Sequence, residues 1–148
     1  MTIARALRVR LAIVLLLTAG LAACYSNQGA YVAPNVDLDH DALYFVVYSK
    51  RDERSLHEQI AERMRKRGFN VVTGFESQMP ASAKYLVEYA GQWQWDMRWY
   101  LLALEIRLYR PDNRELIASA HSTRSSLAAK DPADMIDEAL DQLFAADT

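Results

Sequence analysis

Cys24 is the only cysteine of this 148-residue chain, and a thiolate is the strongest nucleophile that a side chain can supply. It follows three arginines (Arg5, Arg8 and Arg10), an apolar run over residues 11–17, and small residues over 18–23. A basic start, a short apolar core and small residues before a cleavage point form the layout of an export signal. The apolar run is shorter than the ~20 residues of a comfortable transmembrane helix. We therefore predict that residues 1–23 are an export signal and that Cys24 is chemically modified.

The residues Leu21, Ala22, Ala23 and Cys24 resemble the lipobox of bacterial lipoproteins. The resemblance implies that the Cys24 thiol receives a diacylglyceryl group, that the signal is cut just before it, and that further acyl chains complete the anchor. Several chains suit the purpose, because a single chain binds membranes only marginally. The alternative is a secreted protein that is cut after Ala23 without lipid. In similar lipoproteins an aspartate after the cysteine retains the protein in the inner membrane, so Tyr25 implies the periplasmic face of the outer membrane.

After residue 23 the chain carries 14 basic and 19 acidic side chains. This acidic balance argues against a nucleic-acid-binding protein, which needs a basic patch. It also makes the domain a poor electrostatic ligand for anionic lipid headgroups. The membrane attachment that we expect therefore depends on the lipid at Cys24.

Carboxylates and an imidazole alternate in Asp37, Asp39, His40 and Asp41, a pattern that could bind calcium, manganese or zinc. The segment lacks the glycine and the distal glutamate of an EF-hand loop. A polar segment leading into the first strand explains the same residues, and we predict no metal site and no cofactor.

Catalytic motifs are not evident in the sequence. The histidines are His40, His57 and His121, and none lies in a nucleophile elbow, a phosphate-binding loop or a zinc-protease motif. Thiol catalysis in the folded part is excluded, because no cysteine follows Cys24. We predict that the protein is not an enzyme.

Closely spaced aromatic residues are the strongest candidates for binding, since tryptophan and tyrosine concentrate at interface hot spots and at membrane surfaces. Strand alternation places Trp93 and Trp95 on the apolar face of their strand, where we interpret them as core. Alternation points Trp99 away from Tyr100, onto an uncovered sheet face. We therefore predict a partner-binding patch made of Trp99, Arg98, Gln92, Gln94 and Arg107.

The elements that position these residues begin after a segment without strand or helix periodicity, residues 25–40, which reads as a tether. An apolar run over residues 43–48 predicts a buried strand. A helix follows, with Ser55 and Glu58 in the pattern of a capping box and Gly68 in the pattern of a left-handed C-cap. A second strand over residues 70–73 completes a βαβ unit, whose strands we expect to be parallel.

Alternation over residues 85–95, 100–108 and 115–123 predicts three antiparallel strands in a meander, and Asp131 and Pro132 begin a final amphipathic helix. The predicted fold is α+β, a two-layer sandwich in which a βαβ unit precedes the meander and the C-terminal helix. The predicted organisation is a signal peptide over residues 1–23, the lipidated cysteine and flexible tether over 24–41, and a single domain over 42–148.

The motif Trp93, Gln94, Trp95, Asp96 and the later strand over residues 116–120 resemble a group of small, poorly characterised proteobacterial lipoproteins. The resemblance covers most of residues 43–145. The layout is also similar to domains of envelope-assembly lipoproteins, including the partner of the lipopolysaccharide transport barrel, at the level of the fold alone. These resemblances imply no catalytic residues. We expect a membrane-anchored, non-catalytic binding or assembly module. The alternatives are an envelope protein that self-associates through a sheet edge, and a periplasmic enzyme.

Overall fold

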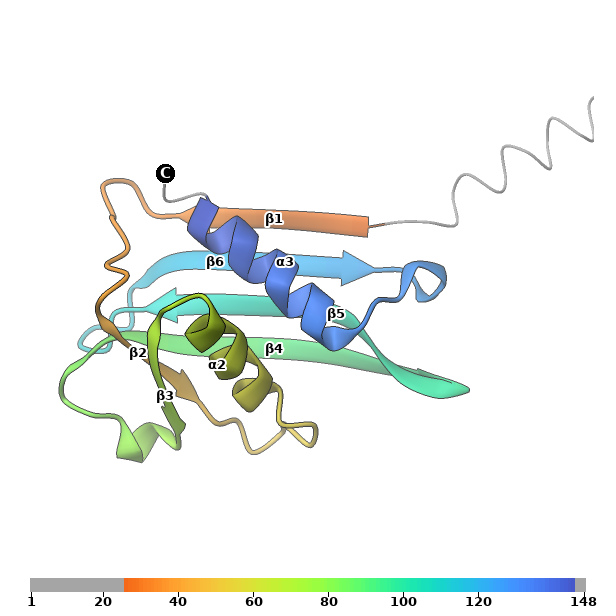
Figure 1. The fold of residues 1–148 in the computed structure, drawn as a ribbon, viewed down its shortest axis with the longest axis horizontal. Helices are drawn as coiled ribbons and strands as arrows, with labels where there is room; N and C mark the ends of the chain where they lie inside the picture. Colours follow the sequence, from red (N-terminus) through yellow and green to blue (C-terminus); the bar gives the residue numbers. More distant parts are fainter. Residues whose placement is uncertain (1–25, 146–148) are drawn as a thin grey trace, which may run out of the picture.

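The computed structural model describes residues 26–145 (Figure 1). The predicted signal peptide and Cys24 lie outside the described residues. The elements in chain order are β1 (Ser26–Val32), β2 (Leu43–Val47), α2 (Leu56–Lys66), β3 (Asn70–Gly74), η1 (Glu76–Gln78), β4 (Ala83–Asp96), β5 (Arg98–Tyr109), β6 (Leu116–Arg124), η2 (Ser126–Ala128) and α3 (Pro132–Ala145).

The described strands form one mixed sheet in the order β1-β6-β5-β4-β2-β3. Strand β2 runs parallel to both β3 and β4, and the remaining pairs, β1 with β6, β6 with β5, and β5 with β4, are antiparallel. Helices α2 and α3 lie across the same face of this sheet (Figure 1). The predicted α+β class is therefore confirmed.

The core lies between the sheet and the two helices. Tyr44, Val46 and Leu104 point up from the sheet, and Ile60 and Leu140 point down from the helices; each is at most 1% exposed. Ion pairs join the helices above this core, since Arg63 of α2 and Arg67, the C-cap residue of α2, contact Asp137 of α3 at 2.7 and 2.6 Å. Burial alone acts to lower the pKa of Arg67, but the carboxylates beside it raise that pKa overall.

Strand β1 corrects the prediction of a flexible tether over residues 24–41. Residues 26–32 pair with β6 along their whole length, from Ser26 opposite Arg124 to Val32 opposite Ala118. Their side chains are mostly exposed, so no apolar alternation marks them as a strand. Backbone hydrogen bonds to β6 hold the segment in place. The residue types of the segment itself do not reveal pairing with a strand so distant in the sequence. Leu38, further along the same segment, is 2% exposed.

The start of α2 also differs from the prediction. Ser55 is the N-cap residue, but its backbone is left-handed (φ 53°) and its side chain makes no capping hydrogen bond. The Asp52 carboxylate takes that role and accepts a hydrogen bond from the His57 amide at 3.0 Å. The other end agrees with the prediction, because Gly68 has φ 91° and the Phe69 amide donates to Met64, as in a Schellman motif.

A β-bulge interrupts the long β4–β5 hairpin. Gln92 lies opposite Ala103, whereas Trp93 lies opposite Leu101, so Leu102 is an extra residue in β5. One extra residue reverses which side chains face the helices. Leu101 therefore joins the core with Leu104, although strict alternation places these two residues on opposite faces.

Candidate functional site

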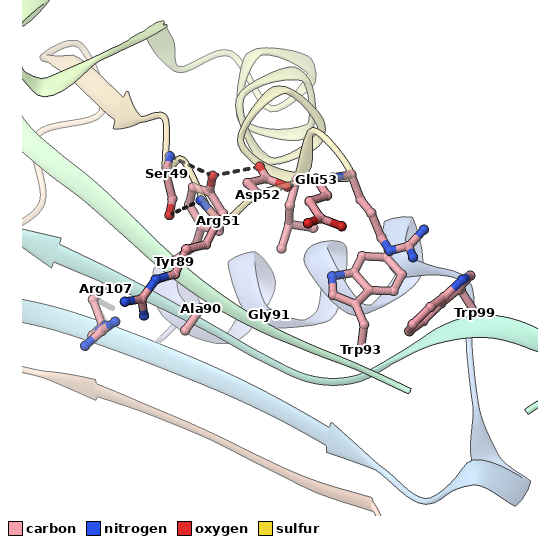
Figure 2. Close-up of a pocket in the computed structure, with 12 residues that line it drawn as sticks. Ser49, Arg51, Asp52, Glu53, Tyr89, Ala90, Gly91, Trp93, Trp99 and Arg107 are labelled. Carbon is pink, nitrogen blue, oxygen red and sulfur yellow. Dashed lines mark hydrogen bonds between the residues drawn. The ribbon is translucent and has the colours of Figure 1, made fainter. Parts of the chain in front are cut away.

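The described domain has a cleft of about 490 Å³ where the loop before α2 meets the second half of β4 (Figure 2). Beyond Val87, β4 no longer pairs with β2, and the loop over residues 49–54 crosses this open edge. The cleft is lined by Ser49, Arg51, Asp52, Glu53, Arg54, Leu56, Tyr89, Ala90, Gly91, Trp93, Trp99 and Arg107. It combines cations, carboxylates and aromatic rings in one hollow.

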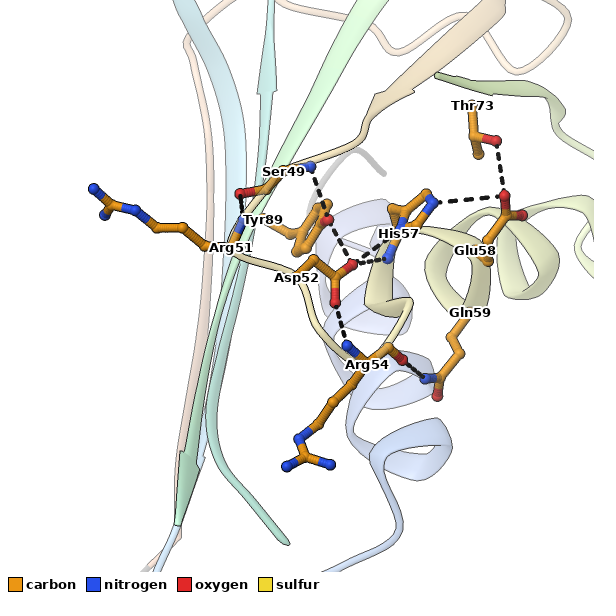
Figure 3. A network of polar contacts seen from close by, with 9 residues as sticks. All are labelled: Ser49, Arg51, Asp52, Arg54, His57, Glu58, Gln59, Thr73 and Tyr89. Atoms are coloured by element: carbon orange, nitrogen blue, oxygen red, sulfur yellow. Dashed lines mark hydrogen bonds and ion pairs between the residues drawn. The ribbon is translucent and has the colours of Figure 1, made fainter. Parts of the chain in front are cut away.

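Asp52 is the centre of a polar network at the inner end of this cleft (Figure 3). Its carboxylate accepts hydrogen bonds from the Tyr89 hydroxyl at 2.7 Å and from the Arg54 amide at 3.1 Å. Nδ1 of His57 lies 2.9 Å from Asp52 Oδ2. The Tyr89 hydroxyl in turn accepts a hydrogen bond from the Ser49 amide at 3.3 Å. The network ties the loop, the start of α2 and strand β4 together.

The network holds Asp52 ionised. Burial acts to raise its pKa, since the side chain is only 4% exposed. Hydrogen bonds from backbone amides, the His57 ring and the Tyr89 hydroxyl outweigh burial and lower the pKa to about 2. Burial and the negative charge of Asp52 raise the pKa of Tyr89, so the phenol stays protonated and donates to the carboxylate.

Asp52 and His57 have the contact of the acid and base of a catalytic triad, but the remaining geometry differs. The outer ring nitrogen of His57 faces Glu58 Oε1 at 3.6 Å, and Glu58 accepts a hydrogen bond from the Thr73 hydroxyl at 3.3 Å. The Ser49 hydroxyl, on the far side of Tyr89, accepts a hydrogen bond from the Arg51 amide. The described network thus places the carboxylate of Glu58, and not a nucleophile, beside the ring nitrogen of His57 that points away from Asp52.

The outer wall of the cleft is aromatic. The Arg54 guanidinium lies over both Trp93 and Trp99, 5.0 and 4.4 Å from the ring centroids. The rings of Trp95 and Trp99 are 5.6 Å apart. Figure 2 shows Trp93 and Trp99 beside each other at one end of the cleft. Arg54 belongs to the loop before α2, so Trp99 lies on the helix-covered side of the sheet.

The structure therefore divides the predicted binding patch. Trp99 is on the helix side because of the bulge, and its predicted place on the uncovered face is wrong. Gln92 lies on the other face, beside Glu105 and His121 in a second, more open hollow. Gln94 pairs with Tyr100, and Arg98 pairs with Asp96 at the hairpin turn. Arg107 borders the main cleft at the opposite end from Trp99 (Figure 2).

The acidic segment considered for metal binding is engaged in other contacts. Asp39 pairs with Lys84 at 2.8 Å, and this contact is the main cause of its lowered pKa. His40 stacks on Phe69 with ring centroids 4.7 Å apart. Within residues 26–145, no three histidine, cysteine or acidic side chains gather in a geometry suited to a metal ion.

Sequence reasoning did not identify Asp52, Arg54 and Tyr89 as parts of a site. In the sequence, Asp52 and Arg54 lie in a charged stretch between a predicted strand and a predicted helix, and Tyr89 lies on the apolar side of a predicted strand. The only available signal was the capping preference of an aspartate three residues before Ser55. The contact of Arg54 with two tryptophans 39 and 45 positions later had no local signal.

None of the helices described between residues 26 and 145 is long and apolar enough to span a bilayer. No protein-family model matches the chain, and no curated protein is similar to it in sequence.

Solved structures define the class of fold. The PelC dodecamer from Paraburkholderia phytofirmans matches with a TM-score of 0.58 and 15% identity, over 80% of this chain and 98% of that chain. A point variant of the same dodecamer gives a TM-score of 0.56 and 17% identity, over 82% and 99%. A minor lipoprotein from Acinetobacter baumannii gives a TM-score of 0.38 at 15% identity, over 74% of this chain and 94% of that chain, which is too low to indicate a shared fold. The chain thus has a PelC-like α+β fold, which by itself assigns no activity.

Proposed function

We propose that the chain is a lipid-anchored protein of the bacterial envelope, attached through Cys24 to the periplasmic face of the outer membrane. Its folded domain is a binding or assembly module without catalytic function. One observation carries this proposal: the polar groups at the inner end of the cleft are bonded to one another, whereas tryptophans and an arginine line its outer wall.

That division of residues suits binding better than catalysis. The Asp52 carboxylate is saturated by amides and side chains, and its hydrogen bonds hold the loop in one conformation. Arginine and tryptophan are the residue types that contribute most to protein interfaces. The half-exposed ring of Trp99, covered in part by Arg54, offers such a surface at the mouth of the cleft.

The anchor is tested by replacing Cys24→Ser in the full chain expressed in a Gram-negative host. We expect incorporation of labelled fatty acid into the protein to be lost and the protein to leave the membrane fraction. The unchanged chain, grown in parallel, is the control. Equal labelling of the two chains contradicts the anchor.

Partner binding is tested by crosslinking in the native envelope with Trp99→Ala. We expect the main crosslinked species to fall severalfold, because the ring is the largest exposed group of the cleft mouth. Gln92→Ala is the matched control, since Gln92 lies on the other face of the same hairpin. Undiminished capture by Trp99→Ala counts against the cleft mouth as the binding surface.

Self-association is a second candidate function, and two observations favour it. The structural neighbour PelC is a dodecamer. In addition, the described sheet ends in β1 on one side and β3 on the other, and an edge strand can pair with another chain. Sheet-edge contact between successive copies is one way to build a closed ring.

Light scattering at increasing protein concentration separates the two candidates. A self-associating chain gives a mass several times that of one chain, and Tyr31→Lys lowers that mass by placing a charge on edge strand β1. Leu127→Lys, outside the strands, is the control. A concentration-independent monomer excludes assembly through β1.

A further inference from the structure

Three separate segments lie at the same end of the sheet: the start of β1, the β4–β5 turn, and η2 after β6 (Figure 1). The strand register fixes their relative heights. Ser26 lies opposite Arg124, and its neighbour Thr123 lies opposite Ala103 of β5. The turn at Met97 therefore projects roughly 17 Å beyond the level of Ser26, at ~3.4 Å per strand residue.

This end also carries the most exposed large apolar side chains of the described residues. Met97 is 93% exposed, Leu127 75%, Trp95 59% and Trp99 50%, and every other exposed large apolar residue in the described part is below these values. Single exposed apolar residues are ordinary, but several at one end of a molecule mark a contact surface. We name Trp95, Met97 and Leu127 the apolar end, which leaves out Trp99 because its ring lines the cleft.

The turn itself is unusual. Met97 has φ 60°, a left-handed conformation that favours glycine or asparagine over a long side chain. Asp96 and Arg98 flank it and lie opposite each other, so the tip has no net charge. The tip of the hairpin thus carries an apolar side chain in a backbone conformation that does not favour it. Because the charges of Asp96 and Arg98 cancel, the tip is not suited to binding a charged surface.

The short stretch of sequence between Cys24 and Ser26 indicates which surface covers this end of the domain. Only Tyr25 stands between Cys24 and Ser26 in the sequence, and two residue steps span at most about 7 Å. We propose that the apolar end rests in the interfacial layer of the phospholipid bilayer to which Cys24 is attached. The inference rests on the proposed anchor. Tryptophan favours the membrane–water interface, and apolar contact adds a second attachment to the acyl chains.

The test uses the tryptophan fluorescence of the full chain, purified from the host membrane in detergent. All three tryptophans, at positions 93, 95 and 99, lie in this hairpin, so their emission reports on it alone. The protein is reconstituted into phosphatidylethanolamine–phosphatidylglycerol vesicles with plain or brominated acyl chains. We expect the brominated lipid to quench roughly half of the emission, with little change at high salt, because interfacial rings lie beside the chains and acidic side chains outnumber basic ones.

Two variants locate the contact. Met97→Asp is expected to lose most of the quenching, because an aspartate at the tip opposes insertion. Leu116→Asp, at an exposed apolar site at the other end of the strands, is expected to keep it. Vesicle-bound protein without quenching, including protein whose tryptophans are shielded by another protein, overturns the proposal. Equal quenching in Met97→Asp and the unchanged chain also overturns it.

A separate measurement tests whether Cys24 is lipidated. The mass of the peptide that contains Cys24 shows whether the residue carries lipid. If it does not, the proposed anchor is wrong, and the same chain is coupled to a maleimide-bearing lipid through its single thiol. Quenching in that preparation supports membrane contact by the apolar end independently of the natural modification, and its absence rejects that contact.

Discussion

The Asp52 carboxylate accepts hydrogen bonds from the Arg54 and His57 amides and from the Tyr89 hydroxyl while almost fully buried. Asp52→Asn keeps the shape but turns one acceptor oxygen into a donor group that faces donors. We expect the free energy of unfolding to fall by about 1.5–3 kcal/mol, the range for hydrogen bonds to a charged group. Urea unfolding measures it, and the exposed Asp41→Asn is expected to change stability by less than about 0.5 kcal/mol. Equal losses in the two variants contradict the role of Asp52.

The same carboxylate makes stability depend on pH. Its folded pKa of about 2 lies below the ordinary value of 3.8, so its contribution is present above pH 4 and is lost as the pH falls toward 2. The full contribution is about 2 kcal/mol, of which about 1 kcal/mol is gone at pH 3. Urea unfolding at pH 6 and pH 3 measures the loss. Other carboxylates titrate in the same range, so the quantity to compare is the loss in the unchanged chain minus that in Asp52→Asn. A difference of zero contradicts the assignment.

Local patterns predicted those elements whose signals are local. The apolar run at β2, the four-residue spacing of Leu56, Ile60 and Met64 in α2, and the glycine that ends this helix were sufficient to place them. Asp131 also marks the start of α3, where its side chain accepts a hydrogen bond from the Ala133 amide at 2.9 Å. In each case the residues that specify the element lie within it or beside it.

Elements that depend on distant pairing were missed. β1 has a polar sequence and is a strand because β6 lies beside it. The bulge adds a residue where β5 is apolar throughout (Leu101, Leu102 and Ala103), so alternation was continued past it and assigned Trp99 to the wrong face. The candidate site was not predicted for the same reason, because Arg54 contacts Trp99 only when the hairpin and the loop fold against each other.

Gly91 allows helix α2 to approach strand β4 closely. A Cβ at this position lies 2.8 Å from a terminal methyl group of Leu56, closer than carbon atoms approach without displacement. We expect Gly91→Ala to cost about 1–2 kcal/mol, since Leu56 is buried and must shift. Thermal or urea unfolding measures this cost. In a Leu56→Ala background the space is empty, and the added methyl group is expected to cost much less. Additive effects of the two substitutions contradict direct contact as the cause.

At the scale of the whole molecule, the two ends of the sheet differ in character. The apolar end lies at the end of the sheet where β1 begins, whereas Tyr31 and Leu116 are exposed apolar residues at the other end. The helices cover one face and leave both sheet edges accessible within the described part. The proposed anchor, together with the proposed contact of the apolar end, would hold the strands upright on the membrane and leave the sheet edges free to meet neighbouring copies.

This orientation predicts opposite environments for two introduced thiols. If Cys24 carries the proposed lipid, its thiol is blocked, and Leu127→Cys or Leu116→Cys then accepts an environment-sensitive fluorophore at a single place. In vesicles we expect the label at position 127 to shift to the blue, because it enters the interfacial layer, and the label at position 116 to keep its emission in water. Strand β6 runs from position 116 to Arg124, eight residue steps or about 27 Å at ~3.4 Å per residue. Since η2 continues beyond the strand, the two labels lie roughly 30 Å apart. Emission that is the same at the two positions would show that the domain lies flat on the membrane or stands away from it.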